Sequence, residues 1–281
     1  MTGVINVYKE KGYTSHDVVA IVRKKFGRIK TGHTGTLDPQ AEGVLPICLG
    51  RATKLAGYLT AQDKSYRAEL ILGLTTDTYD NSGTTLTTAP VDYTIQEIRE
   101  AVDFFVGSYM QMPPMYSAIR VGGKRLYELA REGITIERKA RQVEITRIEM
   151  KQENNRLWLD IDCSKGTYIR SLCADIGEKL GCGACMGDLL RTRSGSFTLQ
   201  NAQKLSELEP SHIISVESAF PAPRLDFNGS LNMAINGNVL EYNFQAQDGH
   251  NWLYCEDKLI GLYKAKNGQL RPEVMIYENN K

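Results

Sequence analysis

The chain has 281 residues, of which 42% are hydrophobic and 24% charged, and its formal net charge is +1. This composition is typical of a folded globular protein, and the near-neutral charge excludes a uniformly basic nucleic-acid binder. No run approaches the roughly 20 apolar residues of a membrane span, the N-terminus lacks an apolar signal core, and six scattered cysteines favour reduced thiols. We therefore expect a cytoplasmic protein with no membrane contact.

The first part of the chain is predicted to combine strands and short helices. Thr14 followed by Asp17 has the spacing of a helix N-cap, and an apolar stripe follows it. The predicted elements are a strand at Gly3–Lys9, a helix ending at Gly27, an irregular glycine-rich stretch at Thr31–Pro46, a short helix at Arg51–Thr60 and a strand at Ser65–Leu72.

The middle of the chain continues the pattern, with single helices between strands. The predicted elements are a loop at 75–93, a helix after the capping box Thr94–Glu97, a helical patch at Leu126–Ala130, strands at Val143–Met150 and Leu157–Cys163, and a helix at Tyr168–Leu180 ended by Gly181. This alternation predicts an α+β domain over residues 1–220, with a mixed, largely antiparallel sheet flanked by helices.

The character of the chain changes near its C-terminal quarter. Pro221 and Pro223 bracket a predicted linker. Three short apolar segments with glycine turns follow, at Trp252–Cys255, Leu259–Tyr263 and Val274–Tyr277. We expect a separate, small all-β domain over residues 224–281.

The stretch Gly32–Pro39 presents one acid, Asp38, within a glycine-rich loop. Glycines permit tight turns and close approach of a ligand to the backbone. Pro39 restricts Asp38 to an extended conformation, which holds the carboxylate away from a helix. Composition alone favours a plain structural turn capped by Asp38. The stretch matches neither a phosphate-binding loop nor a dinucleotide fingerprint, so no nucleotide cofactor is predicted.

Gly32–Pro39, followed by Gly43–Pro46, resembles the catalytic motif of the TruB family of tRNA pseudouridine synthases. Three further blocks resemble family motifs in the same order, and they lie at Lys64–Arg67, Met112–Ala118 and Cys163–Leu172. The C-terminal part, with Leu259–Tyr263, is similar to the small β-rich PUA domain. The resemblance covers nearly the whole chain.

The resemblance implies an isomerase that converts uridine 55 in the T-loop of tRNA to pseudouridine after flipping the base out of the RNA. It implies that Asp38 is the catalytic residue, acting as nucleophile or as base on the ribose. Arg170 matches the arginine that pairs with the catalytic acid, and Tyr66 the tyrosine against the target base. An ordinary salt bridge and a core aromatic are the plainer interpretations of these two. No cofactor is required.

The resemblance also implies an RNA-binding set. His33 would fill the space left by the flipped base, with Thr36 in the same motif and Asp77 in a supporting role. An RNA-gripping loop is expected at about 115–141. Residues 119–142 hold seven cations and three acids, an excess of four positive charges that would suit phosphates. The expected contacts from this loop are Arg120, Lys124, Arg125 and Arg141, although a solvated loop would explain each one singly.

Cys182 and Cys185 form a C-x-x-C pair, which permits a zinc or redox site. No second pair or histidine spacing completes such a site, so no metal is predicted. Three rival functions remain: a non-catalytic RNA-binding or RNA-folding protein on the same scaffold, a zinc-dependent hydrolase, and a guide-RNA-dependent relative. The expected partner is the T-stem-loop of tRNA, bound by a monomer with no obligatory protein or guide RNA.

Overall fold

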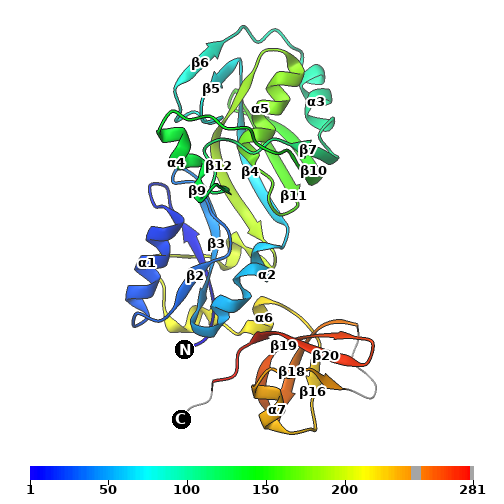
Figure 1. Cartoon of the computed structure of the whole chain (residues 1–281). Coiled ribbons are helices and arrows are strands. Elements are labelled where there is room, and N and C mark those ends of the chain that lie inside the picture. Colours follow the sequence, from blue (N-terminus) through cyan, green and yellow to red (C-terminus); the bar gives the residue numbers. More distant parts are fainter. Residues whose placement is uncertain (242–247, 279–281) are drawn as a thin grey trace. The chain divides into compact units, whose positions relative to one another are not determined.

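The computed structural model describes residues 1–241 and 248–278. The chain forms two compact units, each built from segments that are distant in the sequence (Figure 1). The first unit consists of Met1–Pro39, Val44–Ala61 and Ser196–Lys281. The second unit consists of Gln40–Gly43 and Gln62–Gly195.

The second unit is built on an antiparallel run of five strands. Their spatial order is β12 (Ala184–Ser194), β4 (Lys64–Leu72), β11 (Arg156–Cys163), β10 (Arg141–Glu153) and β7 (Gly107–Gln111). Smaller elements complete the unit: the hairpin β5 (Leu74–Thr76) and β6 (Thr85–Thr88), the hairpin β8 (Arg120–Val121) and β9 (Lys124–Arg125), and the helix α4 (Leu126–Arg131).

Two helices of this unit follow from clear sequence signals. Helix α3 (Ile95–Asp103) begins at Thr94, whose side chain accepts the Glu97 N–H in a capping box. Helix α5 (Ile169–Leu180) ends at Gly181, which has a left-handed φ of 87°. Helix α5 packs on β12 and β4, and α3 packs on α5 and β10 (Figure 1). Both helices therefore cover the sheet whose strand β4 carries Tyr66.

The N-terminal part of the first unit surrounds the strand β1 (Gly3–Lys9), which pairs in parallel with β14 (Gln203–Lys204) and antiparallel with β15 (Ile213–Ile214). Strand β2 (Thr31–His33) pairs antiparallel with β3 (Glu42–Leu49). The remaining elements are α1 (Ser15–Lys25), η1 (Gly50–Leu55), α2 (Ala56–Thr60), β13 (Phe197–Thr198), η2 (Leu199–Asn201), η3 (Pro210–His212) and α6 (Val216–Ala219).

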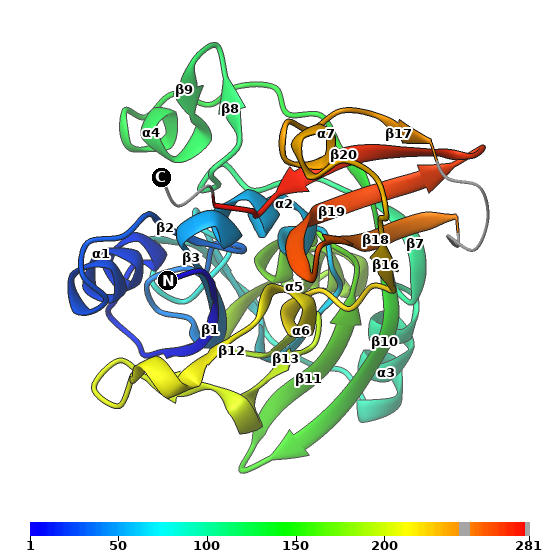
Figure 2. The same ribbon diagram turned by 90° about the horizontal axis from the view of Figure 1, so that it is seen from below.

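The C-terminal part of the first unit is a five-stranded sheet with one short helix (Figure 2). Its order is β16 (Arg224–Asp226), β18 (Gly249–Cys255), β19 (Lys258–Lys266), β20 (Gln269–Met275) and β17 (Leu240–Glu241), and the helix is α7 (Leu231–Ile235). Trp252 and Leu262 of this sheet share one hydrophobic core with Leu55 and Leu59 of the N-terminal part. The two parts therefore bury apolar surface against each other within the unit.

The predicted fold class is confirmed, since a mixed, largely antiparallel sheet with few helices is followed by an all-β C-terminal sheet. The irregular stretch predicted at Thr31–Pro46 was wrong, because β2 and β3 lie there. Gly43 pairs in parallel with Arg191, and its missing Cβ lets the two backbones approach closely. Strands β7 and β12, and the hairpin β5–β6, were also missed.

Candidate active site and nucleic-acid interface

Asp38 lies in the loop between β2 and β3, and the residue before it is held by a buried side chain. The Ser15 hydroxyl accepts a hydrogen bond from the Leu37 N–H (2.9 Å) and donates one to the Leu37 carbonyl (3.1 Å). Ser15 and Leu37 are both buried, with exposed fractions of 1% and 4%. The start of α1 therefore fixes both backbone polar groups of Leu37.

The residue after Asp38 is held as well. The Pro39 carbonyl accepts hydrogen bonds from the Gly12 N–H (2.9 Å) and from Nζ of the fully buried Lys9 (3.1 Å). Asp38 itself is half-buried. Since the backbone is fixed on both sides of it, the carboxylate has a narrow range of positions, which suits a group that must meet a reacting atom.

His33, at the end of β2, is oriented by its own loop. Its Nδ1 accepts the Gly35 N–H at 3.3 Å, which places the proton of the neutral ring on Nε2. The His16 ring meets it edge to face, with centroids 5.4 Å apart. Thr36, two residues before Asp38, is exposed. His33, Thr36 and Asp38 therefore lie at the end of β2 and in the loop that follows it, all in the first unit.

In the second unit, β4 carries Tyr66 and Lys64. Tyr66 is 9% exposed and lies opposite Ile161 of β11 and Arg191 of β12 in the sheet. Lys64 is buried and donates to the Gln62 carbonyl. Burial, followed by the charge of Arg191, lowers the pKa of Lys64 to about 8. The strand therefore places a buried aromatic ring and a buried cation two residues apart.

Arg170, in the first turn of α5, is buried and makes contacts that the sequence did not predict. Its Nη1 donates to the Thr78 carbonyl (3.0 Å) and its Nη2 to the Tyr116 carbonyl (2.6 Å). Oδ2 of Asp80 lies 3.6 Å from Nη1. Asp80 was missed because an acid in a Thr/Asp/Asn-rich loop carries no signal of its partner.

Asp77, which the sequence assigned a supporting role in RNA binding, is exposed and contacts its own hairpin. Its Oδ1 accepts the Thr84 N–H at 2.7 Å, and its own N–H donates to the Thr84 carbonyl at 3.2 Å. These contacts close the turn between β5 and β6.

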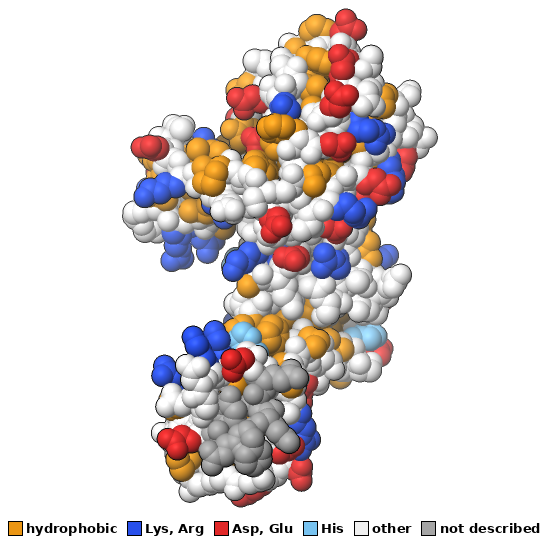
Figure 3. Space-filling view, turned by 90° about the vertical axis from the view of Figure 1, so that its right-hand side faces the viewer, with side chains coloured by type: hydrophobic (Ala, Val, Ile, Leu, Met, Phe, Trp, Pro, Cys, Tyr) orange, Lys and Arg blue, Asp and Glu red, His pale blue; other side chains and the backbone are white. Residues whose placement is uncertain are grey.

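The predicted RNA-gripping segment contains β8, β9 and α4. In Figure 3, lysine and arginine side chains lie along the lower edge of the part that projects at the upper left of the view. Arg120 is exposed, and Lys124 pairs with Glu132 at 2.9 Å. Arg125 donates to the Tyr127 hydroxyl at 3.1 Å. Arg141 lies 4.4 Å above the Tyr168 ring and donates to the Gly166 carbonyl.

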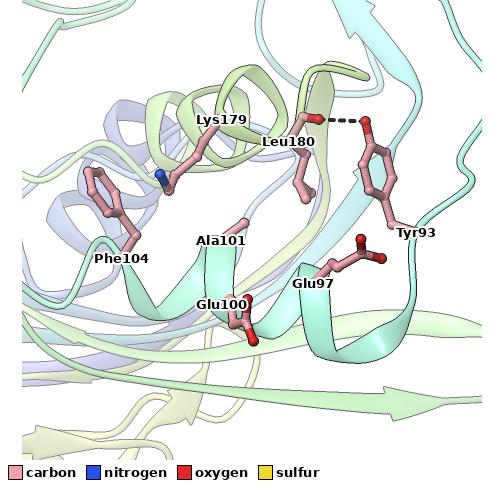
Figure 4. Close-up of a pocket in the computed structure, with 7 residues that line it drawn as sticks. All are labelled: Tyr93, Glu97, Glu100, Ala101, Phe104, Lys179 and Leu180. Atoms are coloured by element: carbon pink, nitrogen blue, oxygen red, sulfur yellow. Dashed lines mark hydrogen bonds between the residues drawn. The ribbon is translucent and has the colours of Figure 1, made fainter.

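Two further features lie apart from these residues. All six cysteines, including Cys182 and Cys185, are buried free thiols, and the described ranges contain no cluster of three or more His, Cys, Asp or Glu arranged to hold a metal. A surface hollow of about 440 Å³ is lined by residues of α3 and α5, together with Tyr93 and Phe104, which flank α3 (Figure 4). None of the predicted site residues lines it.

Within the described part of the chain, no helix has the length and apolarity needed to cross a membrane.

Comparison with known proteins is consistent across sequence and structure. The family model for the N-terminal domain of the TruB family pseudouridylate synthases matches residues 23–169, and the model for the tRNA pseudouridylate synthase B C-terminal domain matches residues 170–221. The tRNA pseudouridine synthase B of Alkaliphilus oremlandii is 45% identical over 95% of this chain and 94% of its own length. That of Clostridium perfringens is 51% identical over 78% of this chain and 77% of its own length.

Among solved structures, an H/ACA RNP bound to a substrate RNA containing 2′-deoxyuridine contains a similar chain. The TM-score is 0.71 at 25% identity, and the match covers 99% of this chain and 86% of that chain. The fold and the sequence together define the class, which is that of the pseudouridine synthases, enzymes that isomerise uridine. Within that class, this chain belongs to the TruB family.

Proposed function

We propose that this enzyme converts uridine 55 in the T-loop of tRNA to pseudouridine, with Asp38 as the catalytic group. The observation that carries the proposal is the loop in which Asp38 lies between two anchored residues, Leu37 and Pro39. The names of its relatives, tRNA pseudouridine synthase B, support tRNA as the substrate.

The reaction requires little more from the protein than a carboxylate held next to the ribose of the target uridine. The bond between uracil N1 and ribose C1′ breaks, the base turns, C5 bonds to C1′, and the C5 proton leaves while N1 gains a proton. An ionised Asp38 would act as a nucleophile at C1′ or as a base on the neighbouring ribose carbon. Neither route changes the oxidation state of the substrate, so neither consumes a redox carrier.

The remaining site residues have supporting roles in this proposal. Arg170 pairs with Asp38 and favours its ionised form, because a neutral acid would leave the guanidinium without its counter-charge. Tyr66 stacks on the flipped uracil. His33 stacks on the base exposed by flipping and recovers part of the few kcal/mol of unstacking. Thr36 and Asp77 support the bound RNA.

We further propose the division of labour along the chain. Residues 1–220 form the catalytic domain, and residues 224–281 form a PUA-like RNA-binding domain. The segment 115–141 grips the T-stem-loop through Arg120, Lys124, Arg125 and Arg141, whose charges suit phosphates. The enzyme acts in the cytoplasm as a monomer on tRNA alone, without a guide RNA or protein partner.

The direct test is tritium release from a T-stem-loop RNA that carries uridine labelled at C5. Every conversion frees the C5 hydrogen, so release counts turnovers. We expect stoichiometric release from the hairpin. A matched hairpin with cytidine at position 55 and labelled uridine elsewhere should release none. No release from the first hairpin, or equal release from both, would contradict the proposal.

A further inference from the structure

A second concentration of positive charge lies far from the segment 115–141 in the sequence. Between Asp17 and Asp38 the chain contains no acidic residue. Within that interval five cations fall inside eight residues, in the last turn of α1 and the turn that follows it. We call these residues the α1 basic patch: Arg23, Lys24, Lys25, Arg28 and Lys30. All five are exposed, in a chain whose net charge is only +1.

The α1 basic patch lacks the counter-charges that other surface cations have. Arg147 pairs with Asp162 at 2.8 Å, Lys151 with Asp160 at 3.0 Å, and Arg156 with Glu69 at 2.6 Å. Over residues 1–241 and 248–278, none of the five patch cations forms an ion pair with a carboxylate. Lys25 donates only to backbone carbonyls, those of Leu205 and Ser206. The patch therefore holds positive charge that the described protein does not neutralise.

Helix stability explains only part of this arrangement. Cations in the last turn of a helix interact favourably with its dipole. Arg23, Lys24 and Lys25 meet that condition, whereas Arg28 and Lys30 lie beyond the end of α1. Crowded like charges also repel one another, so extra cations give diminishing benefit to the fold. An anionic ligand accounts for the whole set.

The position of α1 relates the patch to the Asp38 loop. The first residue of α1, Ser15, holds Leu37, so this end of the helix lies against the loop. The helix has 11 residues and spans about 16 Å. The patch at its other end is therefore about 16 Å from the loop, which is several nucleotide steps along a helical strand.

We propose that the α1 basic patch binds backbone phosphates of the RNA substrate several nucleotides away from the uridine that reacts. The identity of the ligand as RNA rests on the proposed function. Phosphate contacts carry no sequence information, so the patch supplies affinity and fixes the RNA along α1 instead of selecting the base. It is separate from the grip assigned to 115–141, since that segment belongs to the other unit.

The test removes three charges from the patch by Arg23→Gln, Lys24→Gln and Lys30→Gln in one variant. Lys25 is kept because it contacts Leu205 and Ser206, and Arg28 because its φ of 60° is left-handed. We expect the Kd for intact tRNA to rise at least 10-fold near 0.15 M salt. The slope of log K against log salt should fall by about 2–3, close to one unit for each phosphate contact.

The control carries Arg147→Gln and Lys151→Gln, which remove two charges from cations of β10 that already have carboxylate partners. We expect its Kd to stay within about twofold of the wild-type value and its salt slope to stay within about half a unit. A third variant, Lys24→Arg with Lys30→Arg, keeps the charge and should bind like wild type even if the Gln variant melts earlier.

Three results would overturn the proposal: an unchanged Kd and salt slope in the patch variant, equal losses in the patch variant and its control, or a loss of binding in the Arg variant. Because these are binding measurements, they separate the two proposals. An enzyme that binds tRNA through the patch but releases no tritium would contradict the proposed function and leave the patch in place.

Discussion

The Asp38 loop and the segment 115–141 are held in opposite ways. The Asp38 loop has almost no regular structure, yet buried groups outside it hold Leu37 and Pro39. The segment 115–141 contains two short strands and a helix, but many of its contacts are internal. Examples are the pair of Lys124 with Glu132 and the hairpin between Val121 and Lys124.

The difference matches the two tasks that we propose for these regions. A catalytic carboxylate must be within a fraction of an ångström of its working position, and buried hydrogen bonds to the flanking backbone provide this. An RNA-gripping segment must adapt to its ligand, and exposed self-contained structure permits this. The segment is attached at its base, where Arg170 binds the Tyr116 carbonyl and Arg138 binds the Pro113 carbonyl. Its more distal part has fewer such attachments.

The largest loss of activity should come from Arg170→Ala, because Arg170 is linked to both regions. The variant loses the contacts to Thr78 and Tyr116 and the proposed partner of Asp38, so kcat/KM should fall roughly 10²- to 10³-fold, equivalent to about 3–4 kcal/mol of transition-state stabilisation. Asp80→Asn is the control, because it removes the negative charge 3.6 Å from Arg170 but keeps a side-chain oxygen for the hydrogen bonds from Thr78 and Ser82, and it should lose less than about 10-fold. Near wild-type turnover by Arg170→Ala would refute the assigned pairing.

The next effect should come from Ser15→Ala, which releases the Asp38 loop on one side. Two buried backbone groups of Leu37 lose their partner, at about 1–3 kcal/mol for each unsatisfied group. We expect kcat to fall about 10- to 100-fold. Thr14→Ala is the adjacent control, since it removes the α1 N-cap, worth about 1 kcal/mol, and does not touch Leu37. Equal kcat values for the two variants would show that anchoring of the loop is irrelevant.

A smaller effect, a roughly 10-fold change in cleavage rate, is expected in limited proteolysis of the segment 115–141. Trypsin should cut fastest between Lys124 and Arg141 in the free protein, and a T-stem-loop should slow these cuts about 10-fold. Added salt should reduce the protection because phosphate contacts release counterions. Cleavage after Arg147 and Lys151, within β10, serves as the internal reference. Equal cutting with and without saturating RNA would remove the gripping role.

The smallest effect should come from a site outside both regions. Burial raises the pKa of Asp175 to about 6, and the Tyr109 hydroxyl lies 3.4 Å from its Oδ2. The fold therefore favours the protonated acid, and this stabilising contribution is lost as pH rises through about 6. Asp175→Asn should raise the free energy of unfolding by about 1 kcal/mol at pH 7.5 and leave it unchanged at pH 4. A gain of equal size at both pH values would contradict this account.

The sequence predicted elements well where local signals were strong. The capping boxes at Thr14 and Thr94 and the glycine stop at Gly181 all lie at observed helix ends. Strands β7 and β12 were missed because neighbouring strands stabilise them, and a single sequence does not show its neighbours.

The candidate site divides in the same way. The motif around Asp38 was visible as a run of residues, whereas its anchors Lys9 and Ser15 were not, because their partners lie 30 and 22 positions away. Asp80, 3.6 Å from Arg170, was hidden for the same reason, since 90 positions separate the two residues. Contacts between distant positions leave no local pattern.

The central claim is that Asp38 performs the chemistry and does not merely help to bind RNA. Asp38→Asn tests it most directly, because the side chain keeps its shape and loses the ionisable group. Tritium release and the Kd for tRNA should be measured on the same preparation. The account predicts no detectable release above background at saturating RNA, with a Kd within about threefold of wild type. Tritium release at a substantial fraction of the wild-type rate by the tRNA-bound Asp38→Asn variant would contradict it.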